Sequence, residues 1–84
     1  MKGDSKMNSV TVKIRFNTIK DVQRFVEIVR QFEGDIDLAT GRYVVDAKSI
    51  MGIFSLDLTS PITLTAYAES CSKLMEEIKD YIVD

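Results

Sequence analysis

Residues 35–46 read Asp-Ile-Asp-Leu-Ala-Thr-Gly-Arg-Tyr-Val-Val-Asp, and this stretch decides the fold class. Apolar and polar side chains alternate over residues 35–39, as they do in a strand with one buried face. Residues 42–46 return with β-branched and aromatic side chains, which favour a second strand. Between them, Thr40 and Gly41 predict a tight turn, because glycine tolerates the positive φ that short hairpin loops need. The pattern therefore predicts a β-hairpin and, with it, an antiparallel sheet.

Two further segments alternate in the same way, one near each end of the chain. Residues 10–16 are predicted to form a strand that buries one set of side chains: Val10, Val12, Ile14 and Phe16. Residues 62–67 are predicted to form another, with Ile62, Leu64 and Ala66 on the buried face. Pro61 stands just ahead of this strand, where its missing N–H costs little. We expect four strands in total.

Helical spacing of apolar residues indicates a helix over residues 19–32, after strand 10–16. Thr18 is its expected N-cap, with Asp21 completing a capping-box variant, and Gly34 is expected to end it in the left-handed conformation. A last helix is expected to begin at Ser70 as N-cap and to bury one stripe: Cys71, Leu74, Met75, Ile78 and Ile82. A short, weak helix is expected over residues 50–56, with Ser49 as its N-cap.

The predicted order of elements is β-α-β-β-α-β-α, which is an α+β fold with helices on one face of a largely antiparallel sheet. We expect residues 1–8 to be a flexible leader and residues 9–84 to form a single domain, as the length of 84 residues suggests.

The amino-acid composition excludes several kinds of catalytic and metal site. The chain has a net charge of −2, one cysteine and no histidine. It therefore lacks a Ser/His/Asp set and a Cys/His pair, it has no glycine-rich phosphate loop, and one cysteine cannot build a metal site. We expect a protein-binding module rather than an enzyme, with no metal and no cofactor. An enzyme using Cys71 is the weaker alternative, because Cys71 lies on the expected buried stripe.

Charge and hydropathy bear on partners and location. A net charge of −2 argues against direct nucleic-acid binding. The longest apolar run, residues 50–54, is far short of the about 20 residues of a membrane span. A single cysteine fits a reducing cytoplasm. We expect a cytoplasmic protein that is a monomer by default, although strand exchange between hairpins would give a dimer.

The segment after the hairpin holds five large apolar residues in seven: Ile50, Met51, Ile53, Phe54 and Leu56. A two-turn helix has only one stripe toward the core, and exposed Met and aromatic side chains often mark a protein-binding patch. Burial under a loop explains the spacing equally well. Ser49 is by itself an ordinary N-cap, but a phosphate there would meet the free N–H groups of the first turn and add nearly two negative charges beside the apolar residues.

Residues 46–56, Asp-Ala-Lys-Ser-Ile-Met-Gly-Ile-Phe-Ser-Leu, closely resemble the signature of the HPr family, the small phosphocarrier proteins of the bacterial sugar phosphotransferase system. That signature is roughly Asn-Ala-Lys-Ser-Ile-Met-Gly, two apolar residues, Ser and Leu. Residues 32–36 and 62–64 also resemble their counterparts in the family. The resemblance implies an open-faced β-sandwich, with a four-stranded antiparallel sheet covered on one face by three helices.

The family's second motif, Gly-Leu-His-Ala-Arg-Pro, aligns without gaps on residues 16–21. The phosphorylatable histidine then corresponds to Thr18, the arginine to Lys20 and the proline to Asp21. A hydroxyl cannot form the high-energy phosphoramidate that the family passes on, so we expect Thr18 to be a helix cap.

The serine motif remains, and in the family the serine that matches Ser49 is modified by HPr kinase/phosphorylase. The modified form acts as a co-repressor for a catabolite control regulator. The resemblance implies a regulatory protein without phosphohistidine transfer, phosphorylated on Ser49. Its expected docking residues are Ile50, Met51 and Phe54, with Lys20 and Arg24. An unswitched HPr-shaped adaptor and a residual phosphocarrier that uses another residue are the alternatives.

Overall fold

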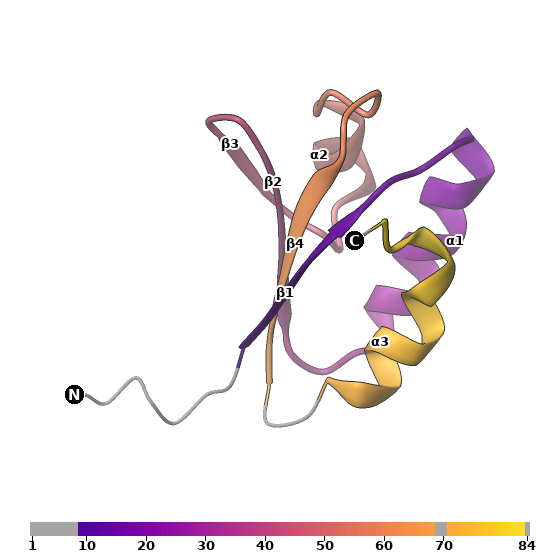
Figure 1. The fold of residues 1–84 in the computed structure, drawn as a ribbon, viewed down its shortest axis with the longest axis vertical. Helices are drawn as coiled ribbons and strands as arrows, with labels where there is room; N and C mark the ends of the chain where they lie inside the picture. Colours follow the sequence, from indigo (N-terminus) through magenta and orange to yellow (C-terminus); the bar gives the residue numbers. More distant parts are fainter. Residues whose placement is uncertain (1–8, 69–70, 84) are drawn as a thin grey trace.

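A computed structural model describes residues 9–68 and 71–83. Four strands of this part of the chain form one antiparallel sheet (Figure 1). The strands lie in the order β1-β4-β2-β3, so β1 and β3 are the edges. Their bounds are β1 Ser9–Ile14, β2 Asp35–Thr40, β3 Tyr43–Asp46 and β4 Ile62–Tyr67. The two central strands are β2, from the hairpin, and β4, from the last third of the sequence.

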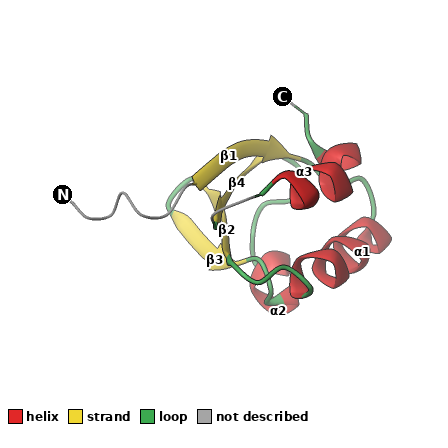
Figure 2. Cartoon of the chain, turned by 90° about the horizontal axis from the view of Figure 1, so that it is seen from below, coloured by secondary structure: helices red, strands yellow, loops and turns green. Residues whose placement is uncertain are grey.

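Three α-helices and one 3₁₀ turn complete the fold: α1 Ile19–Arg30, α2 Ile50–Phe54, α3 Ser72–Ile78 and η2 Lys79–Tyr81. All three helices lie on one side of the sheet, and the other side is open (Figure 2). This arrangement confirms the predicted β-α-β-β-α-β-α order and the open-faced sandwich. The predicted leader, residues 1–8, and the predicted cap Ser70 lie outside the described residues. No helix in the described part of the chain is long and apolar enough to cross a membrane.

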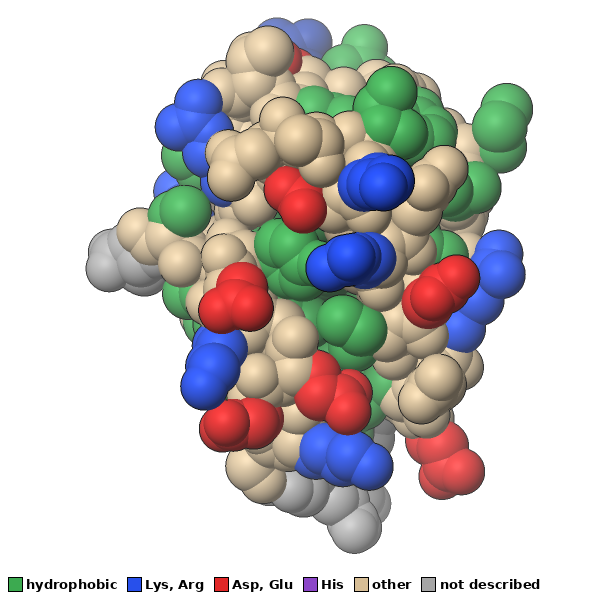
Figure 3. Space-filling model, turned by 90° about the vertical axis from the view of Figure 1, so that its right-hand side faces the viewer, with side chains coloured by type: hydrophobic (Ala, Val, Ile, Leu, Met, Phe, Trp, Pro, Cys, Tyr) green, Lys and Arg blue, Asp and Glu red, His purple; other side chains and the backbone are tan. Residues whose placement is uncertain are grey.

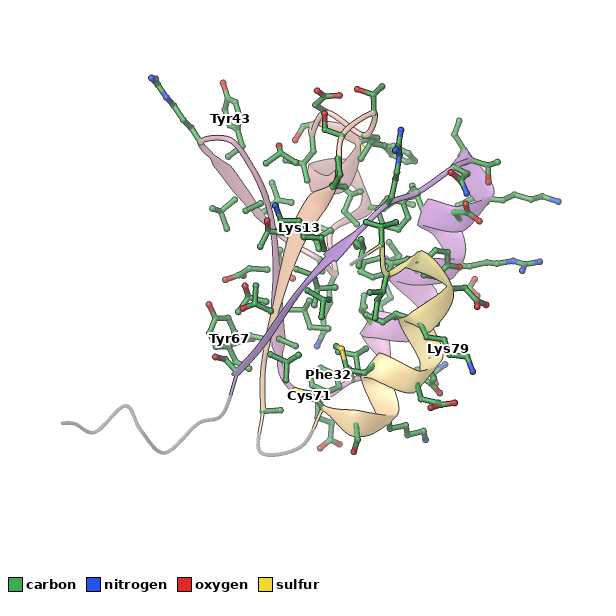
Figure 4. All side chains as sticks on the ribbon, in the orientation of Figure 1. Lys13, Phe32, Tyr43, Tyr67, Cys71 and Lys79 are labelled. Carbon is green, nitrogen blue, oxygen red and sulfur yellow. The ribbon has the colours of Figure 1, made fainter. Side chains whose placement is uncertain are left out.

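The core lies between the sheet and the helices, where the alternation of each strand places its apolar residues. Ile62, Leu64 and Ala66 of β4 are fully buried. They pack with the buried stripe of α1, which contains Val22, Phe25, Val26 and Val29. Cys71 and Phe32 point into the same layer between the sheet and the helices (Figure 4). Each fully buried large apolar side chain stabilises the fold by roughly 1.5–3 kcal/mol.

The end of β1 is joined to the C-terminal segment. Phe16, just beyond the strand, packs edge-on against Phe25 at a centroid distance of 5.1 Å and, with tilted rings, against Tyr81 at 5.8 Å. Backbone hydrogen bonds from Arg15 N to Tyr81 O, 2.8 Å, and from Val83 N to Lys13 O, 2.9 Å, hold the two segments together. The C-terminal segment thus protects part of the β1 edge.

Four local predictions were wrong in detail. β1 spans Ser9–Ile14 rather than residues 10–16, so Phe16 lies beyond the strand. The helix over residues 19–32 ends at Arg30 with Gln31 as a right-handed C-cap, so Gly34 does not close it in a left-handed conformation. The hairpin turn is Gly41-Arg42 rather than Thr40-Gly41, because Thr40 pairs with Tyr43 in the ladder. The short helix ends at Phe54 rather than at residue 56.

Gly34 is needed for a different reason, which is a close approach between chain segments. A Cβ at Gly34 would collide with the carbonyl oxygen of Tyr67 and would lie 2.7 Å from Cε2 of Phe32. Gly41, by contrast, has φ of +55°, and a Cβ added there would have no other atom within 4 Å. The two glycines therefore serve packing and backbone conformation respectively.

We predict that Gly34→Ala lowers the free energy of unfolding by about 1–3 kcal/mol, because a methyl group forced into a filled space displaces the backbone of β4. The matched control Gly41→Ala should lose only about 1 kcal/mol, from left-handed backbone strain. Urea denaturation followed by circular dichroism measures both values. Equal losses in the two variants would contradict the packing role of Gly34.

Candidate functional site

Ser49 is exposed and occupies the N-cap of α2, as predicted. Its Oγ accepts a hydrogen bond from Gly52 N at 3.2 Å, and its backbone carbonyl accepts from Ile53 N at 3.0 Å. The backbone N–H of Ser49 donates to Asp46 O at 3.0 Å, so the turn after β3 leads directly into the helix. The hydroxyl is thus fixed in position at the surface.

The apolar residues of α2 divide between the core and the solvent. Ile53 is fully buried and Leu56 is nearly so, whereas Met51 is 78% exposed and Phe54 is 42% exposed. Ile50 is half-buried. Residues 51 and 54 are three apart and so share one face of the helix. Ile50, Met51 and Phe54 are called the α2 patch below, and their exposure favours the patch over simple burial.

Lys48 fixes the turn that carries Ser49, through a contact that no local sequence pattern indicates. Its Nζ donates to the carbonyl oxygen of Phe32, beyond the end of α1, at 2.8 Å. Its backbone N–H donates to Asp46 Oδ1 at 2.9 Å. The side chain is half-buried and engaged, so it is not available to bind a phosphate on the adjacent serine without breaking this contact.

Thr18 caps α1 in a complete capping box. Its Oγ1 accepts from Asp21 N at 3.1 Å, and Asp21 Oδ2 accepts from Thr18 N at 3.3 Å and from Asn17 N at 2.9 Å. Both halves of the box were predicted. The Asp21 carboxylate therefore lies beside the Thr18 hydroxyl, where it would repel a phosphate group.

A shallow depression of about 400 Å³ lies next to Thr18. The end of β1, the start of α1 and the loop after α2 line it, with Arg15, Ile19, Leu58 and Thr59 among its residues. Arg15 Nη2 donates to Thr59 O at 3.2 Å across it. The structure therefore brings the loop after α2 to the start of α1.

That loop is organised by Asp57. Its Oδ1 accepts from Thr59 Oγ1 at 2.5 Å and from Thr59 N at 3.0 Å. These hydrogen bonds to the ionised form lower the pKa of the exposed Asp57 carboxyl below its ordinary value. The loop structure held by Asp57 is therefore favoured above the ordinary carboxyl pKa and weakens as the pH falls through the lowered one.

The predicted basic residues Lys20 and Arg24 are both exposed on α1, which packs against α2. Arg24 borders a depression lined by Glu77, Asp80 and Tyr81, on the α3 and η2 side. The structure therefore does not bring Arg24 to the α2 patch. On the helical side of the molecule, basic and acidic side chains are interspersed, and neither sign forms a continuous surface there (Figure 3).

Cys71 is buried, and its Sγ lies 3.9 Å from the carbonyl oxygen of Ala66. This confirms its predicted place on the buried stripe and weighs against a reactive thiol. In the described part of the chain, no three His, Cys, Asp or Glu residues come together in a group that could hold a metal ion.

A comparison with known protein families shows which family the chain belongs to. The family model described as "PTS HPr component phosphorylation site" matches residues 19–84. The chain belongs to the HPr family. The HPr match thus covers α1, the sheet from β2 onward and the segment that carries Ser49.

Solved HPr structures agree with this assignment. A crystal structure of phosphocarrier protein HPr from Bacillus anthracis str. Ames is 27% identical, covers 93% of this chain and 99% of its own, and superposes with a TM-score of 0.69. HPr-C-His from Thermoanaerobacter tengcongensis is 24% identical over 87% of this chain and 88% of its own, with a TM-score of 0.67, and supports the fold. A comparison with curated protein sequences found no match.

We predict that Thr18→Ala lowers the free energy of unfolding by about 1 kcal/mol, because it leaves the start of α1 without its side-chain cap. Thr18→Ser, the matched control, retains the accepting hydroxyl and should stay within about 0.5 kcal/mol of the wild type. Thermal and urea unfolding of the three proteins measure the difference. A Thr18→Ala protein as stable as the wild type would mean that the threonine is not retained for capping.

Proposed function

We propose that this HPr family member is a regulatory protein-binding module that is switched by phosphorylation of Ser49 and docks through the α2 patch. The observation that carries the proposal is the placement of an exposed serine hydroxyl at the start of a helix whose next turn exposes Met51 and Phe54. The modifying enzyme we propose is HPr kinase/phosphorylase, and the partner is a catabolite control transcription regulator.

The effect of the phosphate comes from its charge and position. It adds nearly two negative charges next to an apolar surface. Ser49 Oγ makes one hydrogen bond, to Gly52 N, and α2 is held by the burial of Ile53 rather than by this cap. The fold therefore tolerates the modification, while the surface that a partner meets is changed from apolar to mixed apolar and anionic.

Lys20 and Arg24 on α1 are proposed as a second, weaker docking region, separate from the α2 patch. Both are exposed basic residues without a hydrogen bond or ion pair to another described residue. Lys20 is two residues from Thr18, at the end of α1 that lies near the loop after α2. We expect Lys20 to contribute more than Arg24, which faces the acidic residues Glu77 and Asp80.

Phosphohistidine transfer is excluded from the proposal because the sequence contains no histidine. The residue that aligns with the family histidine, Thr18, is occupied as a helix cap and lies beside the Asp21 carboxylate. We therefore place the function of this chain in the regulatory branch of the phosphotransferase system.

We predict that HPr kinase/phosphorylase with ATP adds a single phosphate to the wild-type protein and none to Ser49→Ala. Ser55→Ala is the matched control, because Ser55 is an exposed serine at the other end of the same helix and should not affect uptake. Intact mass spectrometry counts the phosphates, and peptide mapping locates them.

Three other outcomes have distinct meanings. Uptake that persists in Ser49→Ala would contradict the site. No uptake by the wild type would leave an unswitched adaptor that uses the same surface. Acid-labile phosphate after incubation with phosphoenolpyruvate and enzyme I would instead identify a residual phosphocarrier.

A further inference from the structure

The outer edge of β3 is an end of the described sheet with no further strand paired to it. β3 pairs only with β2, and no described strand pairs with its other edge, although α2 and the turn before it contact the end of β3 at Asp46. Tyr43 is 71% exposed and Val44 is 63% exposed, and Tyr43 stands at the tip of the hairpin, away from the body of the molecule (Figure 4). Free strand edges of this kind are templates for pairing with another strand.

The backbone of β3 alternates between groups that face β2 and groups that face solvent. Ala47 N donates to Ile36 O at 2.9 Å, one step beyond the ladder. The direction of the backbone groups alternates from one residue to the next along a strand. Tyr43 and Val45, four and two residues before Ala47, therefore also direct their N–H and C=O groups at β2. Val44 and Asp46 direct theirs outward. Asp46 O already accepts from Ser49 N, so the outward groups without a described partner are the N–H and C=O of Val44 and the N–H of Asp46.

Charges at the two ends of β3 are opposite, and neither is in an ion pair with another described residue, although Asp46 Oδ1 accepts a hydrogen bond from Lys48 N. Arg42 precedes the strand and has no hydrogen bond or ion pair with any described residue. Asp46 ends the strand directly opposite Asp37 of β2, so two like charges face each other across the ladder. Like charges in this arrangement destabilise a sheet. A cation placed beside Asp46 would offset that repulsion.

An antiparallel second copy of β3 meets all of these requirements in one register. With Val44 opposite Val44 of the second copy, the outward backbone groups pair, and each Arg42 stands opposite the other copy's Asp46. If the second copy is shifted so that Val44 lies opposite Asp46, Arg42 lies opposite Lys48, which has the same charge. If it is shifted further by the same step, the two Asp46 residues lie opposite each other. Charge complementarity therefore selects the first register.

We propose that two copies of this chain associate through their β3 edges, in antiparallel register centred on Val44, to form a continuous eight-stranded sheet. The proposal is independent of the proposed function, since neither Ser49 nor the α2 patch forms part of the pairing. β3 has only four residues, so we expect monomers in dilute solution and dimers in concentrated solution. The dimer would carry two α2 patches, which favours partners that are themselves dimeric.

The first test uses the unmodified protein and amide hydrogen exchange measured by NMR in dilute and concentrated samples. The N–H of Val44 should become protected at high concentration, because it then donates to the second copy. The N–H groups of Tyr43 and Val45, which already face β2, should not change. Equal exchange at Val44 in dilute and concentrated samples would overturn the proposal.

The second test uses charge reversal and sedimentation equilibrium. Arg42→Glu alone and Asp46→Lys alone each place like charges opposite each other, so each should associate at least about tenfold more weakly than the wild type, a difference of about 1.4 kcal/mol. An equimolar mixture restores both opposite-charge pairs and should return to near wild-type affinity. A mixture no stronger than its separate components would overturn this register.

Discussion

The burial of Ile53 is the interaction on which the α2 patch depends. A five-residue helix has no independent stability in water, so α2 exists because Ile53 and Leu56 are anchored in the core. Anchoring these two residues sets the rotation of the helix. Met51 and Phe54 are thereby directed to solvent, and Ser49 is fixed at the exposed start. Gly52 allows the close contact with β3, because a Cβ there would lie only 3.2 Å from the Cβ of Val45.

The hydroxyl groups at the starts of α1 and α2 have different surroundings. At α1, Thr18 and Asp21 form a closed set of hydrogen bonds that stabilises the start of the helix. At α2, the serine hydroxyl is exposed and its neighbour Lys48 is tied to the carbonyl of Phe32. One end is therefore structural in this chain, and the other is a surface that a charge can alter.

Much of this could be predicted from the sequence because it rests on local patterns. Alternation located the strands, and the Thr18–Asp21 spacing predicted a capping box that the structure confirms. The motif at residues 46–56 indicated the family. The features that could not be predicted depend on contacts between distant segments. Gly34 is required by Tyr67, which is far away in sequence, and Lys48 bonds to Phe32 across the interior. The free edge of β3 follows from the strand order β1-β4-β2-β3, which no local pattern contains.

The central claim is that a phosphate on Ser49 and the α2 patch act as one binding surface. The most direct test is the affinity of the Ser49-phosphorylated protein for a catabolite control regulator, measured by calorimetry for the wild type and for a variant that lacks the exposed side chains of the α2 patch. The phosphorylated wild type should bind at least about tenfold more tightly than the phosphorylated Met51→Ala/Phe54→Ala variant, since truncating central apolar anchors typically costs more than about 1 kcal/mol each. Unphosphorylated wild type should be weaker by a similar factor. Equal affinity of all three proteins would contradict the claim that a phosphate on Ser49 and the α2 patch act as one surface.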